Sequence, residues 1–485
     1  MSQNSVTSKR LCDENFKSLR KEVLGKWPTG KEVDLNEAIA YHKTMPAEKN
    51  LVGVIRKAKN GHTTLVYPRG GVALLDEQKK LMLYLQDQGG ADYLPTTTDS
   101  YTRNERFRDT EIGIERSRIN GRSMLNGFPV VNYGVQNCRS IIEEIKVPAQ
   151  VLPGTPFVTI IGEIAFAAGY TGLLGSGISD TLRFTKELSL AQGIKNYQYI
   201  DRLVSYYQEK GVSLHREQTG FLTGTLIPPG IALAVAVLDC LLAVSQGVKN
   251  YSLGIGQNLN VVQDVATLRV AGEICCEYLD KFGFNDVSIT TGSHQWMGAF
   301  PTDEAEAVSV ICLGAMIGVL GNATYITTKT SHEAIGVPTP EANAAGLRAT
   351  KKIIKLMRNL RFPLNQEVEI ETNIIKKEVR SIVDKTLELG DGDPALGSIR
   401  GFEAGIIDIP WAPNIHVANK VMPARDYSGA VRYLDFGNLA LTEEVKDFHR
   451  MKLQERASLE NRQVDLQMAI EDVSEVAKSV LETAG

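Results

Sequence analysis

The feature that most constrains the fold is a regular alternation of short apolar runs and helical segments between about residues 50 and 360. Strands that alternate with helices pair in parallel through right-handed crossovers. Strands are expected at 63–67, 93–94, 123–125, 157–161, 213–214, 251–253, 287–291 and 324–328. Helices are expected at 76–88, 232–245, 261–282, 304–320 and 340–360. We therefore expect an α/β fold in which the strands close a (β/α)8 barrel of the TIM type, with an open doubly wound sheet as the alternative.

The segments on either side of this region have a different pattern. A charged N-terminal arm, residues 1–50, contains a helical pattern at 34–41. In the C-terminal extension, residues 361–485, a helix is expected at 365–389, an irregular Gly- and Pro-rich stretch at 401–435, and a long polar helix from Thr442. The predicted division is thus an arm, a barrel over 51–360 that binds the substrate, and a mixed or helical extension that packs on the barrel or serves an interface.

The composition excludes several classes of function. A net charge of −4 argues against nucleic acid as a partner, because no basic surplus neutralises phosphates. The most apolar stretch, 231–244, is too short to cross a bilayer, so no membrane contact is expected. Six cysteines without a CxxC pair, behind a polar N-terminus, favour a cytoplasmic protein with free thiols. No dinucleotide or Walker fingerprint and no metal-ligand spacing occurs, so no metal site is expected in this chain.

Two arginines follow the first two predicted strands, where barrel enzymes place their chemistry. Arg69 lies in a Pro-Arg-Gly-Gly turn, and Arg103 lies in Thr-Arg-Asn. Their guanidinium groups could hold a carboxylate. The alternatives are a surface arginine at the first position and, at the second, an ion pair with Asp99 or Asp109.

Other polar side chains follow later predicted strands. Asn126 could orient a ligand, or it serves turn chemistry. Glu217 could accept a substrate ammonium or hydroxyl group, or it pairs with Arg216. The four-residue spacing of Lys329 and Glu333 suits bonding to one polar ligand such as a ribose, or a simple salt bridge.

Long blocks of this sequence resemble one family. They include KWPTGKEVDL at 26–35, PRGGVALLDE at 68–77, LNGFPVVNYG at 125–134, HQWMGAFP at 294–301 and HEAIGVPTPEANAAG at 332–346. From about residue 13 to the C-terminal helix, the chain resembles the large (epsilon) subunits of glutamate mutase, also called methylaspartate mutase.

The resemblance implies a radical isomerase that depends on adenosylcobalamin. In that family the large subunit is a barrel that holds the substrate and the adenosyl group. A small (sigma) partner subunit carries an Asp-x-His-x-x-Gly motif whose histidine ligates cobalt. None of the seven histidines here lies in that motif. A cobalamin-binding partner, in a heterotetramer of two large and two small chains, is therefore implied.

The resemblance also assigns roles to individual residues. Arg69 and Arg103 match two of three arginines that bind substrate carboxylates, and Glu217 matches an acidic residue of the pocket. The positions that match cofactor contacts are Gly71, Asn126, Arg183, Phe300, Lys329, Glu333 and Val337.

Departures from the family pattern concern the substrate pocket. Leu152 stands where the third arginine is expected, and Leu174 stands where a glutamate receives the substrate ammonium. Two tyrosine positions hold Asp180 and Phe184, and Arg183 replaces a proline. Since an unpaired charge facing leucine is costly, an altered and less polar carboxylic or amino acid is the expected substrate. Ordinary glutamate mutase and a non-catalytic subunit that binds partner and cofactor remain alternatives.

Overall fold

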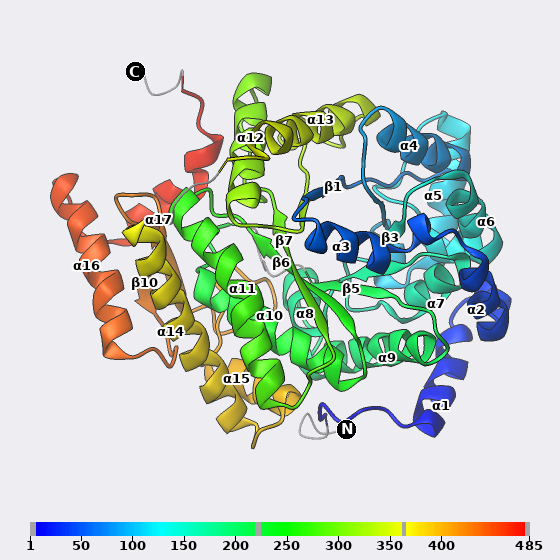
Figure 1. The fold of residues 1–485 in the computed structure, drawn as a ribbon, viewed down its shortest axis with the longest axis horizontal. Helices are drawn as coiled ribbons and strands as arrows, with labels where there is room; N and C mark the ends of the chain where they lie inside the picture. The colour runs from blue at the N-terminus through cyan, green and yellow to red at the C-terminus, as the bar shows by residue number, and fades with distance from the viewer. Residues whose placement is uncertain (1–5, 219–224, 361–364, 481–485) are drawn as a thin grey trace.

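The centre of the molecule is a sheet of eight parallel strands surrounded by helices (Figure 1). The computed structural model describes residues 6–218, 225–360 and 365–480. The strands are β1 (Leu65–Tyr67), β2 (Leu94–Thr97), β3 (Ala149–Leu152), β4 (Gly172–Leu174), β5 (His215–Gln218), β6 (Asn250–Gly256), β7 (Ser288–His294) and β8 (Tyr325–Thr327).

The strands follow one another around the sheet in the order β1-β8-β7-β6-β5-β4-β3-β2. Between β1 and β2, Asp92 closes the seam: its N–H donates to the Val66 carbonyl (3.0 Å), and its carboxylate accepts from the Val66 N–H (2.8 Å). A doubly wound sheet would reverse its strand order, and this sheet does not. The (β/α)8 barrel is therefore confirmed.

Helices of the barrel cover the outside of the strands. Several of these helices begin with an N-cap side chain that accepts from a free backbone N–H group, as at Asn260, Asp303 and Thr339. The helices between β1 and the end of the barrel are α4 (Leu75–Asp87), α5 (Phe107–Asn120), α6 (Val130–Glu144), α7 (Thr159–Ala168), α8 (Gly177–Phe184), α9 (Leu190–Glu209), α10 (Pro229–Ser245), α11 (Val261–Lys281), α12 (Glu304–Leu320) and α13 (Pro340–Met357). A short 3-10 turn, Thr102–Asn104, follows β2.

Two predicted strands are wrong, and a third, at 213–214, lies just before the strand that forms, β5. Residues 123–125 lie in a loop, where the Ser123 hydroxyl donates to the Leu125 carbonyl. Residues 157–161 lead into α7, which is buried along its whole length. A helix with no exposed face shows no 3.6-residue alternation, so its apolar start resembles a buried strand. The true strands, β3 and β4, are short, and neither contains more than one β-branched residue.

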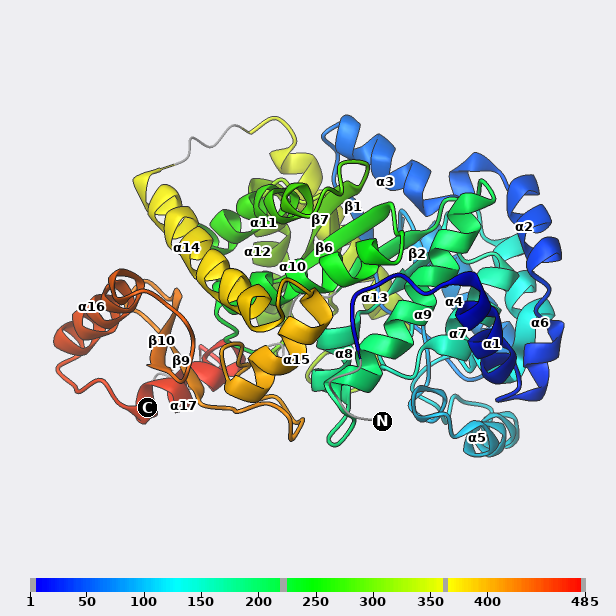
Figure 2. The same cartoon turned by 90° about the horizontal axis from the view of Figure 1, so that it is seen from below.

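The segments outside the barrel pack at its sides. α1 (Asp13–Leu24), α2 (Leu35–Thr44) and α3 (Leu51–Asn60) precede β1, and the Asp34 carboxylate caps α2. In the C-terminal part, α14 (Gln366–Leu389) lies against α10 and α11 (Figure 2). The elements that follow it are α15 (Pro394–Ala404), β9 (Val421–Arg425), β10 (Val431–Phe436), α16 (Glu443–Leu459) and α17 (Leu466–Ser474).

The sequence predicted an irregular stretch at 401–435. This prediction is wrong in part, because β9 and β10 form an antiparallel hairpin within it. A buried ion-pair network fixes it: Arg432 pairs with Glu371 of α14 and with Asp426 (2.7 Å). In Figures 1 and 2 the hairpin, α16 and α17 lie at one end of the molecule, and α1, α2 and α6 at the other. Throughout the described ranges, every helix is too short or too polar to cross a bilayer.

Candidate active site

The sequence-predicted substrate residues gather at the carboxyl ends of the barrel strands. Arg69 follows β1, Arg103 lies in the turn after β2, and Leu152 and Leu174 are the last residues of β3 and β4. Glu217 lies within β5, in register with Leu174. The first five strands thus each bring one of these residues to the same end of the barrel, where TIM-barrel enzymes hold their substrates.

Glu217 lies inside the barrel and is almost completely buried. Its carboxylate accepts from the Tyr67 hydroxyl (2.8 Å) and from the Gln150 amide (2.9 Å). Burial raises the pKa of Glu217 to about 7, and the hydrogen bonds from Gln150 and Tyr67 oppose that rise. The expected alternative, an ion pair with Arg216, does not occur: Arg216 pairs with Asp201 (2.7 Å).

Arg103 is held over the end of β3. Its Nε donates to the Thr98 carbonyl (2.9 Å), and a Cβ on Gly154 would lie 3.1 Å from its guanidinium carbon. Gly154 has φ +60°, so glycine suits both its conformation and this close approach. Burial, with help from Arg69 and Arg183, lowers the pKa of Arg103 to about 10, which leaves it charged at neutral pH.

Neither predicted alternative partner takes Arg103. Asp99 accepts from the Thr102 hydroxyl and from the N–H groups of Tyr101 and Thr102. Asp109 pairs with Arg106 (2.8 Å). The Arg103 guanidinium is therefore positioned by backbone and glycine contacts.

A third arginine reaches the site from α8, which follows β4. Arg183 pairs with Asp180 (3.2 Å), which also accepts from the Tyr197 hydroxyl (2.6 Å). The Arg183 guanidinium lies 4.1 Å from the centre of the half-exposed Phe184 ring. A Cβ on Gly175 would meet the Tyr197 hydroxyl and the Asp180 carboxylate, so this cluster lies directly over the end of β4.

A cavity of about 810 Å³ opens beside Arg69, between α4 and the segment that leads into α13. Of the residues predicted to contact the cofactor, Gly71, Asn126, Glu333 and Val337 line it. A Cβ on Gly71 would lie 2.3 Å from the Thr97 carbonyl, so no other residue fits between the strand ends there. Its volume is in the range of small-molecule and cofactor sites.

Three residues predicted to contact the cofactor make contacts within the protein, as the stated alternatives allowed. Lys329 and Glu333 form an ion pair with each other, and the Phe300 ring centre lies 5.7 Å from the Lys329 ammonium. Burial lowers the pKa of Lys329 to about 8. Asn126 does not end a strand, contrary to prediction: it lies in the loop after α5, and its side-chain oxygen accepts from the Ser100 N–H (2.9 Å).

Several side chains of the site escaped prediction. Tyr67 and Gln150 orient Glu217, and Tyr197 orients Asp180. A two-residue spacing links Tyr67 with Arg69, and Gln150 with Leu152. That spacing could have revealed Tyr67 and Gln150, since alternate residues of a strand face the same side. No local signal marks Tyr197, which reaches the site from α9.

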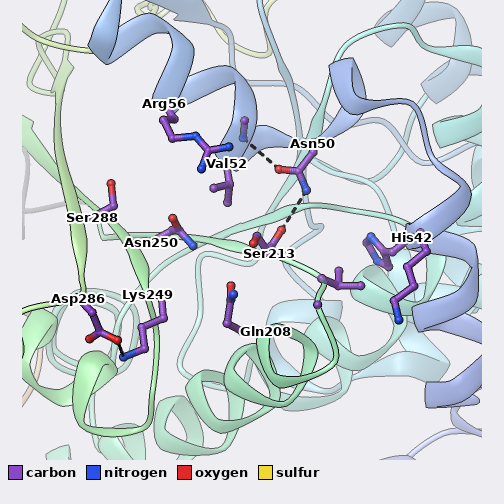
Figure 3. A pocket seen from close by; sticks show the side chains of 14 residues that line it. His42, Asn50, Val52, Arg56, Gln208, Ser213, Lys249, Asn250, Asp286 and Ser288 are labelled. Atoms are coloured by element: carbon purple, nitrogen blue, oxygen red, sulfur yellow. Dashed lines mark hydrogen bonds and ion pairs between the residues drawn. The ribbon is translucent and has the colours of Figure 1, made fainter.

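A second cavity, of about 580 Å³, lies at the opposite end of the barrel (Figure 3). Asn50 spans it with a hydrogen bond to the Ser213 carbonyl (3.1 Å), and Lys249 pairs with Asp286 (2.5 Å). Asn250 and Ser288, the first residues of β6 and β7, also line it. This end of a TIM barrel contributes to stability, so we place the site at the arginine end.

The described ranges contain no group of three or more His, Cys, Asp or Glu side chains arranged to hold a metal ion. The fold and the site together define a protein of the TIM-barrel class whose strand ends carry guanidinium groups beside a cavity of cofactor size.

Comparison with known proteins specifies the family. The model of the methylaspartate mutase E chain family matches residues 45–483, so the chain belongs to that family. It is 48% identical over 476 residues to the glutamate mutase epsilon subunit of Desulfitobacterium hafniense, covering 98% of each chain. It is also 48% identical over 474 residues to the glutamate mutase epsilon subunit of Treponema denticola, again covering 98% of each chain.

Proposed function

We propose that this chain is the large subunit of an adenosylcobalamin-dependent carbon-skeleton mutase whose substrate is a less polar acid than L-glutamate. Membership of the methylaspartate mutase E chain family supports the mutase activity. One observation supports the altered substrate: leucines 152 and 174 end β3 and β4, where the family resemblance implies an arginine and a glutamate. Both leucines are buried.

Arg69 and Arg103 would hold a carboxylate of the substrate. A charge-assisted hydrogen bond to a guanidinium contributes about 1.5–3 kcal/mol. The substrate carbons would then extend toward Leu152 and Leu174. L-Glutamate would place its second carboxylate and its ammonium there, and a charged group without a partner loses several kcal/mol of hydration.

The residues beside this pocket fit the adenosyl part of the cofactor. The cavity of about 810 Å³ is lined by Gly71, where the backbone is closely approached, by the polar side chains of Asn126 and Glu333, and by the exposed Val337. Lys329 and Glu333 would hold the ribose hydroxyls. When bound, adenosylcobalamin supplies the radical chemistry of the rearrangement, and this chain's residues bind, orient and shield the reacting groups.

A small cobalamin-binding subunit is the proposed partner. The cobalt ligand in this family lies in a motif that the present sequence lacks, and the described residues hold no alternative cluster of metal ligands. The exposed Ile335 and Val337 lie on the loop that borders the cavity, where an apolar surface suits contact with a large cofactor or a partner.

Ordinary glutamate mutase is the second candidate, because relatives at 48% identity carry that name. The deciding experiment reconstitutes the chain with a small subunit and adenosylcobalamin and measures L-glutamate turnover. The double variant Leu152→Arg/Leu174→Glu is compared with the wild type, and Leu356→Arg is the exposed control. We expect turnover to rise about tenfold or more in the double variant, because both charged groups regain partners.

Equal turnover of L-glutamate by the wild type and the double variant would contradict the altered substrate. A screen of other acids for a cobalt(II) signal in electron paramagnetic resonance tests the mutase activity itself. The absence of a signal with every acid would favour a non-catalytic subunit.

A further inference from the structure

The acidic groups at the inner end of the site are all engaged by other side chains. Glu217 accepts from Tyr67 and Gln150, and it lies in the barrel interior. Glu333 pairs with Lys329. A substrate ammonium placed near these carboxylates would therefore compete with an existing partner.

Asp99, next to Arg103 along the chain, is occupied in the same way. One of its oxygens accepts from the N–H groups of Tyr101 (2.9 Å) and Thr102 (3.0 Å), and the other accepts from the Thr102 hydroxyl. This Asp99 side chain is completely buried beneath its own turn. It stabilises the turn that carries Arg103 and offers no surface to a ligand.

Asp180 lies over Gly175 at the end of β4, and two partners engage it. Its Oδ2 accepts from Tyr197 (2.6 Å), and its Oδ1 pairs with Arg183 (3.2 Å). Its place over Gly175 sets it immediately beside Leu174. Of the described carboxylates at the inner end of the site, Asp180 is thus the best placed to receive an ammonium at β4, and Arg183 already neutralises it.

A continuous set of contacts fixes this arrangement to the carboxylate-holding arginine. The Thr155 hydroxyl donates to the Arg103 carbonyl (2.6 Å), and the Thr155 carbonyl lies 3.3 Å from the Tyr197 hydroxyl. Tyr197 in turn bonds Asp180. Arg103 and Asp180 are therefore held in fixed relation at the same end of the barrel, so a substrate held by Arg103 would extend toward the Asp180–Arg183 pair.

We infer that this site selects carboxylic acids without an ammonium group, and that Arg183 is a specificity-determining residue because it occupies Asp180. The inference rests on the proposed binding of a substrate carboxylate by Arg69 and Arg103. A hydrogen, hydroxyl or oxo group next to the carboxylate needs no anionic partner beside Leu174. An ammonium there needs one and finds Asp180 already neutralised.

The test measures binding of matched acids to the holoenzyme, formed from both subunits and adenosylcobalamin, by titration calorimetry at pH 7.5. Three pairs differ only in the amino group: glutarate and L-glutamate, succinate and L-aspartate, butyrate and L-2-aminobutyrate. For the wild type, we expect the desamino acid to bind about tenfold or more tightly in the pair that fits best, because a desolvated ammonium lacks its hydrogen bonds.

Two variants separate Arg183 from the rest of the pocket. Arg183→Gln releases the Asp180 charge while retaining an amide, so the preference for the desamino acid should fall about tenfold. Asp180→Asn/Arg183→Gln removes both charges, and it should restore the wild-type preference. Arg400→Gln, at the surface, is the matched control. If Arg183→Gln folds poorly, Arg183→Lys, which keeps a cation beside Asp180, should retain the wild-type preference.

Three results would overturn the inference: equal binding of both members of the best pair by the wild type, an unchanged preference in Arg183→Gln, or no binding of any of the six acids. Failure of the mutase proposal is distinguishable, because it would show as acid binding without a cobalt(II) signal. An ammonium preference with a strong cobalt(II) signal would overturn only the inference.

Discussion

Two layers of side chains in the same barrel differ in how their charged groups are surrounded. In the inner layer, Glu217 is buried with Tyr67 and Gln150, and neutral donors surround its carboxylate. In the outer layer, Arg69 and Arg103 approach each other closely enough that Arg69 lowers the pKa of Arg103. The inner layer places neutral donors around a carboxylate, whereas the outer layer brings guanidinium groups together at the strand ends.

The difference separates structure from recognition. A buried carboxylate with two hydrogen-bond donors contributes to a defined packing arrangement and needs no ligand. Neighbouring guanidinium groups repel one another and are stabilised when an anion lies between them. We therefore expect changes in the inner layer to affect stability, and changes in the outer layer to affect binding.

The largest expected effect is the loss of stability in Glu217→Ala. The substitution leaves the Tyr67 hydroxyl and the Gln150 amide without an acceptor and opens a cavity, at a cost of about 3–5 kcal/mol. Urea denaturation measures the free energy of unfolding. The control Glu217→Gln keeps the volume and, if the Gln150 amide rotates, both hydrogen bonds, so it should remain within about 1 kcal/mol of the wild type near pH 7. Equal stability of the alanine and glutamine variants would show that the inner layer is not a satisfied network.

The second effect is the contribution of Glu217 to the pH dependence of the unfolding free energy. Its pKa in the folded protein, about 7, lies above the ordinary value of 4.5, so the folded state keeps a proton that the unfolded state has lost. Stability should therefore fall as pH rises from about 4.5 to 7 and change little above 8, by about 3 kcal/mol in total.

Other carboxyl groups titrate in the same range, among them Asp264, whose pKa burial also raises to about 7. The measurement is therefore the difference in unfolding free energy between the wild type and Glu217→Gln at several pH values. A difference that stays constant across that window would mean that Glu217 is ionised throughout in the folded protein.

The comparison of layers also shows what sequence can reveal. Strand-end residues such as Arg69 and Arg103 were found because a motif follows an apolar run, and the barrel followed from the strand–helix alternation. The strands β3 and β4 were missed because they are only four and three residues long. β3 contains Gln150 and β4 begins with Gly172, so the β-propensity of each segment is low. Pairing on both sides within the sheet forms such strands, and pairing is not local information.

Side-chain partners were harder still to predict. Asp180 and Arg183 lie three residues apart on α8, so their ion pair was accessible from spacing. Tyr197, on α9, meets Asp180 only because two helices pack together at Gly177 and Gly193. Whether Glu217 faces a ligand or a hydrogen-bond network depends on its neighbours on β1 and β3. No sequence motif predicts which side chains those neighbours are.

The smallest of the expected effects is the sharpest test of the outer layer. Arg103→Met removes one cation that faces Arg69 and Arg183 and loses one hydrogen bond to the Thr98 carbonyl. These two changes oppose each other, so the unfolding free energy should stay within about 1 kcal/mol of the wild type. Binding to the holoenzyme of whichever desamino acid binds the wild type best, measured by calorimetry, should weaken by about 1.5–3 kcal/mol, because a charge-assisted bond is lost.

The control for that variant is Arg106→Met, since Arg106 lies three residues further along and pairs with Asp109 at the surface. It should change neither stability nor binding, because exposed ion pairs contribute little. The reverse pattern, in which Arg103→Met unfolds as easily as Glu217→Ala and binds that desamino acid normally, would make Arg103 a structural residue. The distinction between the two layers would then fail, because both would serve the packing of the barrel.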